Sequence, residues 1–132
     1  MLAYTYVQKG KFELLEKERP VLLDTKDAIV KVTLASICSS DLHIKYGAVP
    51  RAVPGITVGH EMVGIVEEVG TEVESVKVGD RDCEEILKLI EEGKLDTEPL
   101  ITHIYPLERT TEAYELFEGK RDGVIKVAIE CQ

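Results

Sequence analysis

Short stretches rich in β-branched and apolar residues, mixed with charged residues, fill the first part of the chain. Stretches of this kind, interrupted by turn residues such as Gly10 and Pro20, predict β-strands. The predicted strands are residues 2–7, 11–16, 28–35 and 61–69. Many short strands are typical of a β-barrel or a β-sandwich.

The segment 46–59 interrupts this pattern, because its glycines and prolines exclude a long helix. It predicts a loop that leads the chain into the strand at 61–69. A second turn-rich segment follows Gly70 and ends at Arg81.

Residues 82–95 change the pattern from strands to a helix. Acidic residues occupy the first turn, Gly93 lies near the end, and Asp82 and Glu85 have the spacing of a capping box. The apolar residues that recur at helical spacing are Ile86, Leu87, Leu89 and Ile90. The rest of the chain predicts a strand at 100–105, a helix at 111–118 and a strand at 124–130. The expected fold class is therefore mainly β with two or three helices, an α+β fold.

The length of 132 residues fits one domain. We expect residues 1–81 to form its first part and the helix-strand-helix-strand segment 82–132 to complete it. The net charge of −9 and the scattered basic residues argue against nucleic acid as a partner. No apolar run is long enough to cross a membrane and the N-terminus has no secretion signal, so a cytoplasmic location is the default.

Three residues have the right chemistry for a metal site. Cysteine, histidine and carboxylate side chains are the protein ligands of zinc, and Cys38, His60 and Glu61 offer one of each. Taken singly, Cys38 reads as a small buried apolar residue, and the other two read as ordinary polar residues at the start of a strand. Their joint pattern favours a zinc site, since both segments are predicted where loops meet strands.

The segments around these residues resemble a known enzyme family. The stretch GHEMVGIVEEVGTEV at 59–73 matches the signature of zinc-dependent medium-chain alcohol dehydrogenases, and CSSDLH at 38–43 and VGDR at 78–81 occur there in the same order. The tail resembles the end of these enzymes in PLITHIY, TEAYELF and GVIKVAI. The resemblance implies the GroES-like β-barrel of their catalytic domain.

The resemblance also implies roles for individual residues. Cys38 and His60 would be zinc ligands, and Glu61 a carboxylate that can bind the metal or leave it. Asp41 would hydrogen-bond the far nitrogen of His60 and so fix its tautomer. Ser40 would be the hydroxyl that relays the substrate proton, and His43 its next acceptor. The alternative for the last two residues is a polar loop without a catalytic role.

Several parts of the parent enzymes do not occur in these 132 residues. No GxGxxG motif is found, and the chain passes directly from Arg81 to the predicted helix, where the family has a Rossmann domain. The resemblance thus implies a deleted nucleotide-binding domain, NAD(P) as a cofactor of the parent family only, and a missing third strong zinc ligand. Whether Cys83 substitutes for that ligand is open, as is whether the deletion is natural or engineered.

These patterns together predict the zinc-binding catalytic domain of an NAD(P)-dependent alcohol or polyol dehydrogenase, inactive alone and with a weak or partial zinc site. In the parent family the substrate is a small alcohol or ketone. The alternative is a metal-free scaffold or a self-associating module with a vestigial site. We expect a homo-oligomer in either case, because removal of a domain uncovers apolar surface.

Overall fold

The structure of the protein is a computed structural model that describes residues 1–81, 90–94, 96 and 98–131. The strands are β1 (Leu2–Gln8), β2 (Lys11–Glu16), β3 (Ala28–Ser36), β4 (Met62–Val69), β5 (Ile101–Pro106) and β6 (Lys126–Glu130). The helices are α1 (Ser39–Lys45) and α3 (Thr110–Glu118), with the 3-10 turns η1 (Glu98–Leu100) and η2 (Leu107–Arg109). The predicted strands and the helix at 111–118 are confirmed. Most of the helix predicted at 82–95 lies outside the described residues.

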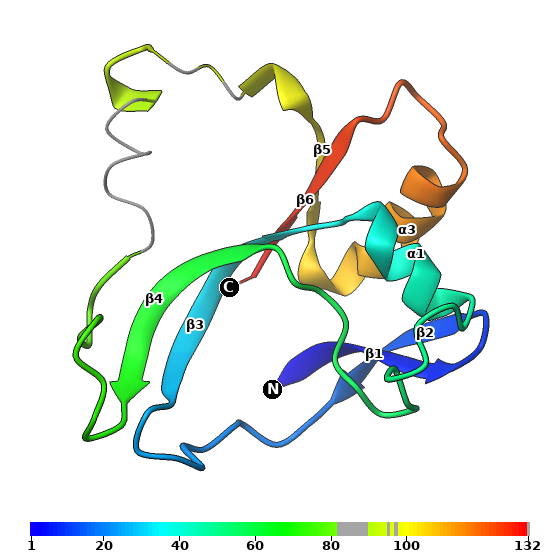
Figure 1. Cartoon of the computed structure of the whole chain (residues 1–132). Coiled ribbons are helices and arrows are strands. Elements are labelled where there is room, and N and C mark those ends of the chain that lie inside the picture. The colour runs from blue at the N-terminus through cyan, green and yellow to red at the C-terminus, as the bar shows by residue number, and fades with distance from the viewer. Residues whose placement is uncertain (82–89, 95, 97, 132) are drawn as a thin grey trace.

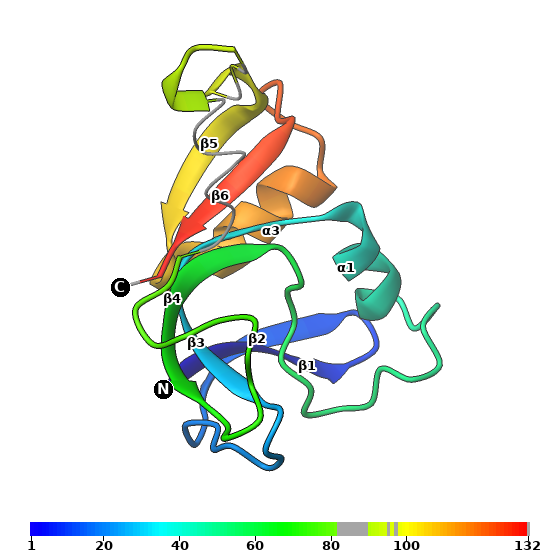
Figure 2. The ribbon, with the colours of Figure 1, turned by 60° about the vertical axis from the view of Figure 1, so that its left-hand side comes forward.

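The strands form two sheets, and the larger one places strands from the last third of the sequence beside strands from its first half. Strands β1 and β2 make an antiparallel hairpin, and the second sheet has the order β4-β3-β6-β5. Strand β6 runs antiparallel to β3, with Ala35 opposite Ile129, and parallel to β5. Figures 1 and 2 show β6 next to β3, far from it in sequence but adjacent in space. The sheet therefore requires the last residues of the chain.

Strand β1 is buried on both of its faces. In a sheet with one face towards solvent, buried and exposed side chains would instead alternate along the strand. Thr5 is 2% exposed, between the buried residues Tyr4 and Tyr6. The loop before β4 runs along this strand, and the backbone N–H groups of Val58 and Tyr6 donate to Tyr4 and Ile56. The loop predicted at 46–59 thus covers β1 before it delivers the chain to β4.

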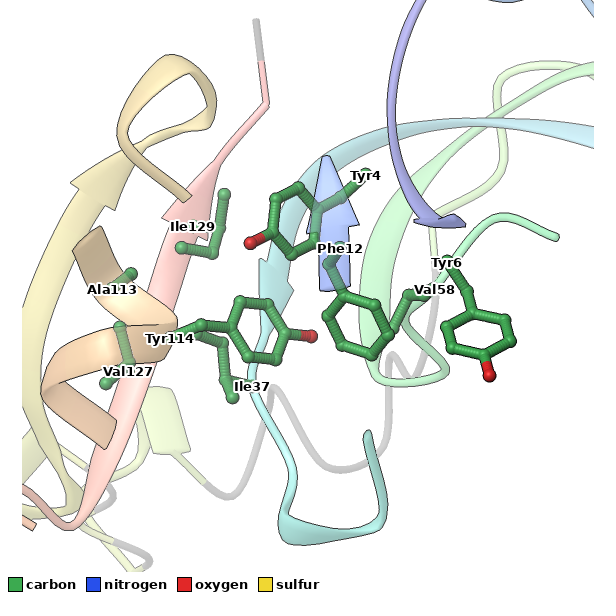
Figure 3. Packing of buried hydrophobic residues seen from close by; sticks show 9 residues of the cluster. All are labelled: Tyr4, Tyr6, Phe12, Ile37, Val58, Ala113, Tyr114, Val127 and Ile129. Carbon is green, nitrogen blue, oxygen red and sulfur yellow. The ribbon is translucent and has the colours of Figure 1, made fainter. Parts of the chain in front are cut away.

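The core lies between the hairpin, α3 and the larger sheet. Tyr4 and Tyr114 stack with ring centroids 5.0 Å apart, and Phe12 meets both rings edge-on. Figure 3 shows the ring of Tyr114 reaching from α3 into this group. The buried cluster consists of Tyr4, Tyr6, Phe12, Ile37, Val58, Ala113, Tyr114, Val127 and Ile129. Its members come from both halves of the chain, so both contribute to one core.

Two glycines of the 59–73 segment lie where the backbone of another segment leaves no room for a side chain. A Cβ atom at Gly64 would lie 2.3 Å from the carbonyl oxygen of Lys31 in β3. A Cβ atom at Gly70 would lie 2.2 Å from the carbonyl oxygen of Thr25. Real side chains do not approach backbone atoms so closely, so these positions require glycine.

The segment CSSDLH corrects one prediction. It was expected where a loop meets a strand, without a helix, but residues Ser39–Lys45 form the helix α1, and the backbone N–H of Cys38 donates to the carboxylate of Asp41 across its first turn. The seven residues carry no helical apolar pattern, and so short a helix depends on tertiary contacts. No helix in the described ranges has the length and apolar character needed to cross a membrane.

Candidate metal centre

The end of β3 positions the first candidate ligand. The N–H of Ser36 donates to the carbonyl of Glu61, and the N–H of Ile37 donates to Val127 of β6. Ile37 is 1% exposed, so the chain is anchored in the core immediately before Cys38. Cys38, the residue just before α1, is therefore held at a fixed place beside the segment that carries His60 and Glu61.

Cys38, His60 and Glu61 come together in space. One ligand atom from each, the thiol sulfur, a ring nitrogen and a carboxylate oxygen, lies within 4.8 Å of the other two. The side chain of His60 is 49% exposed, so the cluster opens to solvent. Sulfur, nitrogen and oxygen from three residues, at a place open to solvent, form a donor set that suits a catalytic zinc ion.

Asp41 lies behind His60. It is completely buried, and its Oδ1 lies 3.2 Å from His60 Nδ1, close enough for an ion pair although the two are not aligned as a hydrogen bond. Its other oxygen, Oδ2, accepts hydrogen bonds from the Cys38 N–H at 3.1 Å and from the Tyr114 hydroxyl at 3.0 Å. The carboxylate thus faces Nδ1 and leaves Nε2 of the ring directed to the cluster.

Ser40 lies between two of the candidate ligands. Its Oγ is 3.2 Å from Cys38 Sγ and 3.0 Å from His60 Nε2. The hydrogen bond from Ser40 lowers the pKa of the Cys38 thiol, and His60 adds to this effect. The hydrogen bond with Cys38 raises the pKa of His60, and the negative charge of Asp41 adds to the rise. A thiol that ionises readily is suited to bind a metal, because the thiolate is the ligand form.

Glu61 is held by two residues from other elements. Its carboxylate accepts hydrogen bonds from Lys126 of β6 and from Ser36 of β3, both to the same oxygen, Oε2. These contacts with Lys126 and Ser36 lower the pKa of Glu61. These two contacts favour the ionised carboxylate and hold it at the edge of the cluster.

Two residues singled out in the sequence are not part of this arrangement. His43 is exposed near the end of α1, and its side chain makes no hydrogen bond among the described residues. Cys83 lies outside the described residues. A proton relay from Ser40 to His43 and a role for Cys83 stay predictions.

Three neighbours of the site were missed in the sequence. Tyr114 is 73 residues from Asp41, and Lys126 is 65 residues from Glu61, so no local pattern connects them. Ser36 is two residues before Cys38, at the end of β3, but nothing in the local sequence indicates that its side chain contacts Glu61. Only the pairing of β3 with β6 and the packing of α3 place these side chains at the site.

A groove of about 480 Å³ borders the cluster. It is lined mostly by apolar side chains, with His60, Glu61 and Lys126 among its few polar ones. Its apolar side chains come from strands of the larger sheet and from η1, and include Met62, Val63, Leu100 and Ile101. A small molecule with an apolar body can therefore lie next to the candidate ligands.

Comparisons with known proteins identify the family of this chain. The alcohol dehydrogenase GroES-like domain model matches residues 24–97, more than half of the chain, and this range includes every candidate ligand. An alcohol dehydrogenase of Cupriavidus necator is 42% identical over 81 residues, which cover 61% of this chain and 22% of the relative. A zinc-type alcohol dehydrogenase-like protein of Bacillus subtilis is 41% identical over 81 residues, which cover 61% of this chain and 21% of that relative.

Solved structures give the same result. The apo form of zinc dependent alcohol dehydrogenase 2 from Streptococcus pneumonia is 44% identical with a TM-score of 0.59. The match covers 61% of this chain and 23% of the dehydrogenase. Alcohol dehydrogenase TADH from Thermus sp. ATN1 is 41% identical with a TM-score of 0.56 and the same coverage. The chain spans between a fifth and a quarter of the length of these relatives. It therefore belongs to the family of alcohol dehydrogenase GroES-like domains.

Proposed function

We propose that this chain is a zinc-binding module from the catalytic domain of an NAD(P)-dependent alcohol or polyol dehydrogenase. The observation that carries the proposal is the convergence of a thiol, an imidazole and a carboxylate within 4.8 Å. Cys38 and His60 hold the metal, and Glu61 supplies a carboxylate that can bind it or stay with Lys126. Asp41 keeps the ring nitrogen of His60 directed to the site.

In the reaction of the parent enzymes, hydride passes between a small alcohol and the nicotinamide of NAD(P), and a zinc ion, when bound, polarises the substrate oxygen. Ser40 lies where a proton can leave that oxygen, and His43 is the next candidate acceptor. The groove beside His60 and Glu61 accommodates the carbon part of the substrate. This reaction, and a cytoplasmic location for it, belong to the proposal.

The experiment that tests the metal site is calorimetric titration of metal-free protein with zinc. We expect one weak binding event, because the parent family draws a further strong ligand from a stretch that these residues lack. If the titration shows no heat of binding at any accessible zinc concentration, the result favours the alternative, a metal-free scaffold with a vestigial site.

We expect no NAD(P)-linked alcohol oxidation by these 132 residues alone, even with zinc and a wide panel of small alcohols. Hydride transfer requires the nicotinamide ring close to the alcohol carbon, and such positioning contributes about 7–11 kcal/mol to lowering the barrier. Proton transfer through Ser40 contributes only about 10²–10⁴-fold, which does not compensate. Absorbance of NADH measures this directly. Turnover that His60→Ala abolishes would reveal a cofactor site and contradict the prediction.

We also propose that the chain self-associates through the larger sheet. Strand β5 is at the edge of this sheet, and Ile101 and Ile104 are 41% and 62% exposed there. Near the other edge, Met62 and Val63 of β4 are about half exposed. An edge strand with apolar side chains is a template for pairing with a second copy.

Sedimentation velocity over a range of concentrations checks this proposal, and we expect a dimer or larger species. Ile104→Lys, which places a charge on the edge strand, should shift the distribution towards monomer. Purely monomeric behaviour of the unmodified protein at high concentration would contradict self-association.

A further inference from the structure

The hydroxyl of Tyr114 is the only side-chain donor to Asp41 Oδ2 among the described residues, and it comes from a different part of the chain. Tyr114 is on α3, 5% exposed, and its hydroxyl lies 3.0 Å from the carboxylate. A buried tyrosine hydroxyl needs a hydrogen-bond partner, and a buried carboxylate needs donors. This contact satisfies both requirements at once.

The carboxylate of Asp41 has two oxygens with different surroundings. Oδ2 is fixed by the Cys38 N–H and the Tyr114 hydroxyl, whereas Oδ1 has no hydrogen-bond partner among the described residues and lies 3.2 Å from Nδ1 of His60. A carboxylate fixed through one oxygen cannot turn freely, so its second oxygen stays directed at Nδ1 of His60. The orientation of Asp41, and through it that of His60, depends on α3.

We propose that Tyr114 is a positioning residue for the candidate metal centre: its hydroxyl fixes Asp41, and Asp41 in turn holds His60 with Nδ1 protonated and Nε2 directed to the metal. This inference rests on the proposed function, because it assigns Nε2 of His60 as the metal-binding atom. Tyr114 touches neither metal nor substrate and acts only through Asp41.

The arrangement also links the site to the core of the domain. The Tyr114 ring stacks on Tyr4 and packs edge-on against Phe12, so the position of its hydroxyl is set by the aromatic cluster rather than by solvent. Burial and the negative charge of Asp41 raise the pKa of Tyr114, which keeps its hydroxyl protonated as a donor. The Tyr114 hydroxyl therefore stays protonated and in place to donate its hydrogen bond to Asp41.

The chain offers a matched control for removal of this hydroxyl. Tyr4 belongs to the same buried cluster, stacks on the same ring, and its hydroxyl lies 3.5 Å from Thr111 Oγ1, away from Asp41. Tyr4→Phe and Tyr114→Phe thus each remove one hydroxyl from the same core. Only the second removes a donor to Asp41.

The first measurement uses metal-free protein, at a pH where the His60 ring is neutral. Long-range ¹H–¹⁵N spectra report the tautomer of each of the three histidines. We expect His60 of the unmodified protein and of Tyr4→Phe to carry its proton on Nδ1. Tyr114→Phe should shift His60 towards the Nε2-protonated tautomer, and Asp41→Asn should shift it at least as far, while His43 and His103 stay unchanged.

The second measurement is the zinc dissociation constant of the same variants. Loss of a residue that contacts a metal-binding histidine typically weakens affinity about 10–100-fold. Tyr114 acts one contact further out, through Asp41, so we expect Tyr114→Phe to reach only the lower end, about tenfold. Tyr4→Phe should change it less than twofold. Thermal unfolding of both variants separates any loss of stability from loss of positioning.

The two measurements test the proposed function and the role of Tyr114 separately. If the unmodified protein binds no zinc, the proposed function is wrong, while the tautomer of His60 still decides the role of Tyr114. If Asp41→Asn shifts the tautomer and Tyr114→Phe does not, Asp41 positions His60 without Tyr114 and this inference is overturned. If neither variant shifts it, Asp41 does not set the tautomer and the inference is equally overturned.

Discussion

Replacement of His60 by alanine is expected to remove measurable zinc binding, and Cys38→Ala should have the same effect. With either variant the cluster keeps two of its three candidate ligands. Removing only a hydrogen-bond partner of a metal-binding histidine costs about 10–100-fold in affinity, so removal of a ligand from a weak site should cost more. Calorimetric titration with zinc, repeated with cobalt for its visible absorption, measures the loss.

His43→Ala is the matched control for this prediction. It removes the same side chain from an exposed position on α1, outside the cluster, and should leave zinc affinity unchanged. The fold should survive His60→Ala, because Asp41 keeps the hydrogen bonds from Cys38 and Tyr114. Tight one-to-one binding that persists in both His60→Ala and Cys38→Ala would show that the ligands are elsewhere.

Gly64→Ala is expected to destabilise the fold strongly. The added Cβ would lie 2.3 Å from the carbonyl oxygen of Lys31 and 2.7 Å from a methyl of Val30, so β3 and β4 must separate. Overpacking of this kind typically costs about 1–3 kcal/mol and occasionally more. An alanine also restricts the unfolded chain, but that effect stabilises by only about 0.4–1 kcal/mol and does not offset the clash.

Urea unfolding measures the effect, and Gly119→Ala provides the comparison. Gly119 lies at the end of α3 with a helical φ of −71°, which alanine adopts. Its added Cβ would lie 2.9 Å from Nε of the flexible Arg121 side chain and 3.0 Å from the carbonyl oxygen of Glu115, a milder conflict than the one at Gly64. We expect its unfolding midpoint to move much less than that of Gly64→Ala. Equal midpoints for Gly64→Ala and the unmodified protein would mean that β3 and β4 are not as close as described.

Much of the fold could be predicted from the sequence, because the signals are local. β-Branched residues between turn residues mark the strands, and the glycines and prolines of 46–59 exclude a helix there. The three candidate ligands were also identified, since their residue types and the long 59–73 segment resemble one family. The structure then brought these three side chains within 4.8 Å of one another.

Other features depend on contacts between residues far apart in the sequence. The helix α1 carries no periodic pattern in its seven residues, and it is tied to the core where Asp41 meets Tyr114 of α3. Strand β1 is buried on both faces only because the loop before β4 runs along it.

The strands, the loop at 46–59 and the identity of the candidate ligands follow from the amino-acid sequence, because backbone preference and residue chemistry are properties of short segments. The surroundings of those ligands depend on how the elements pack against one another. Strand β6 lies beside β3 and places Lys126 against Glu61, and α3 packs on the hairpin and places Tyr114 against Asp41. No short segment contains that information, since each of these pairs joins residues more than 60 positions apart.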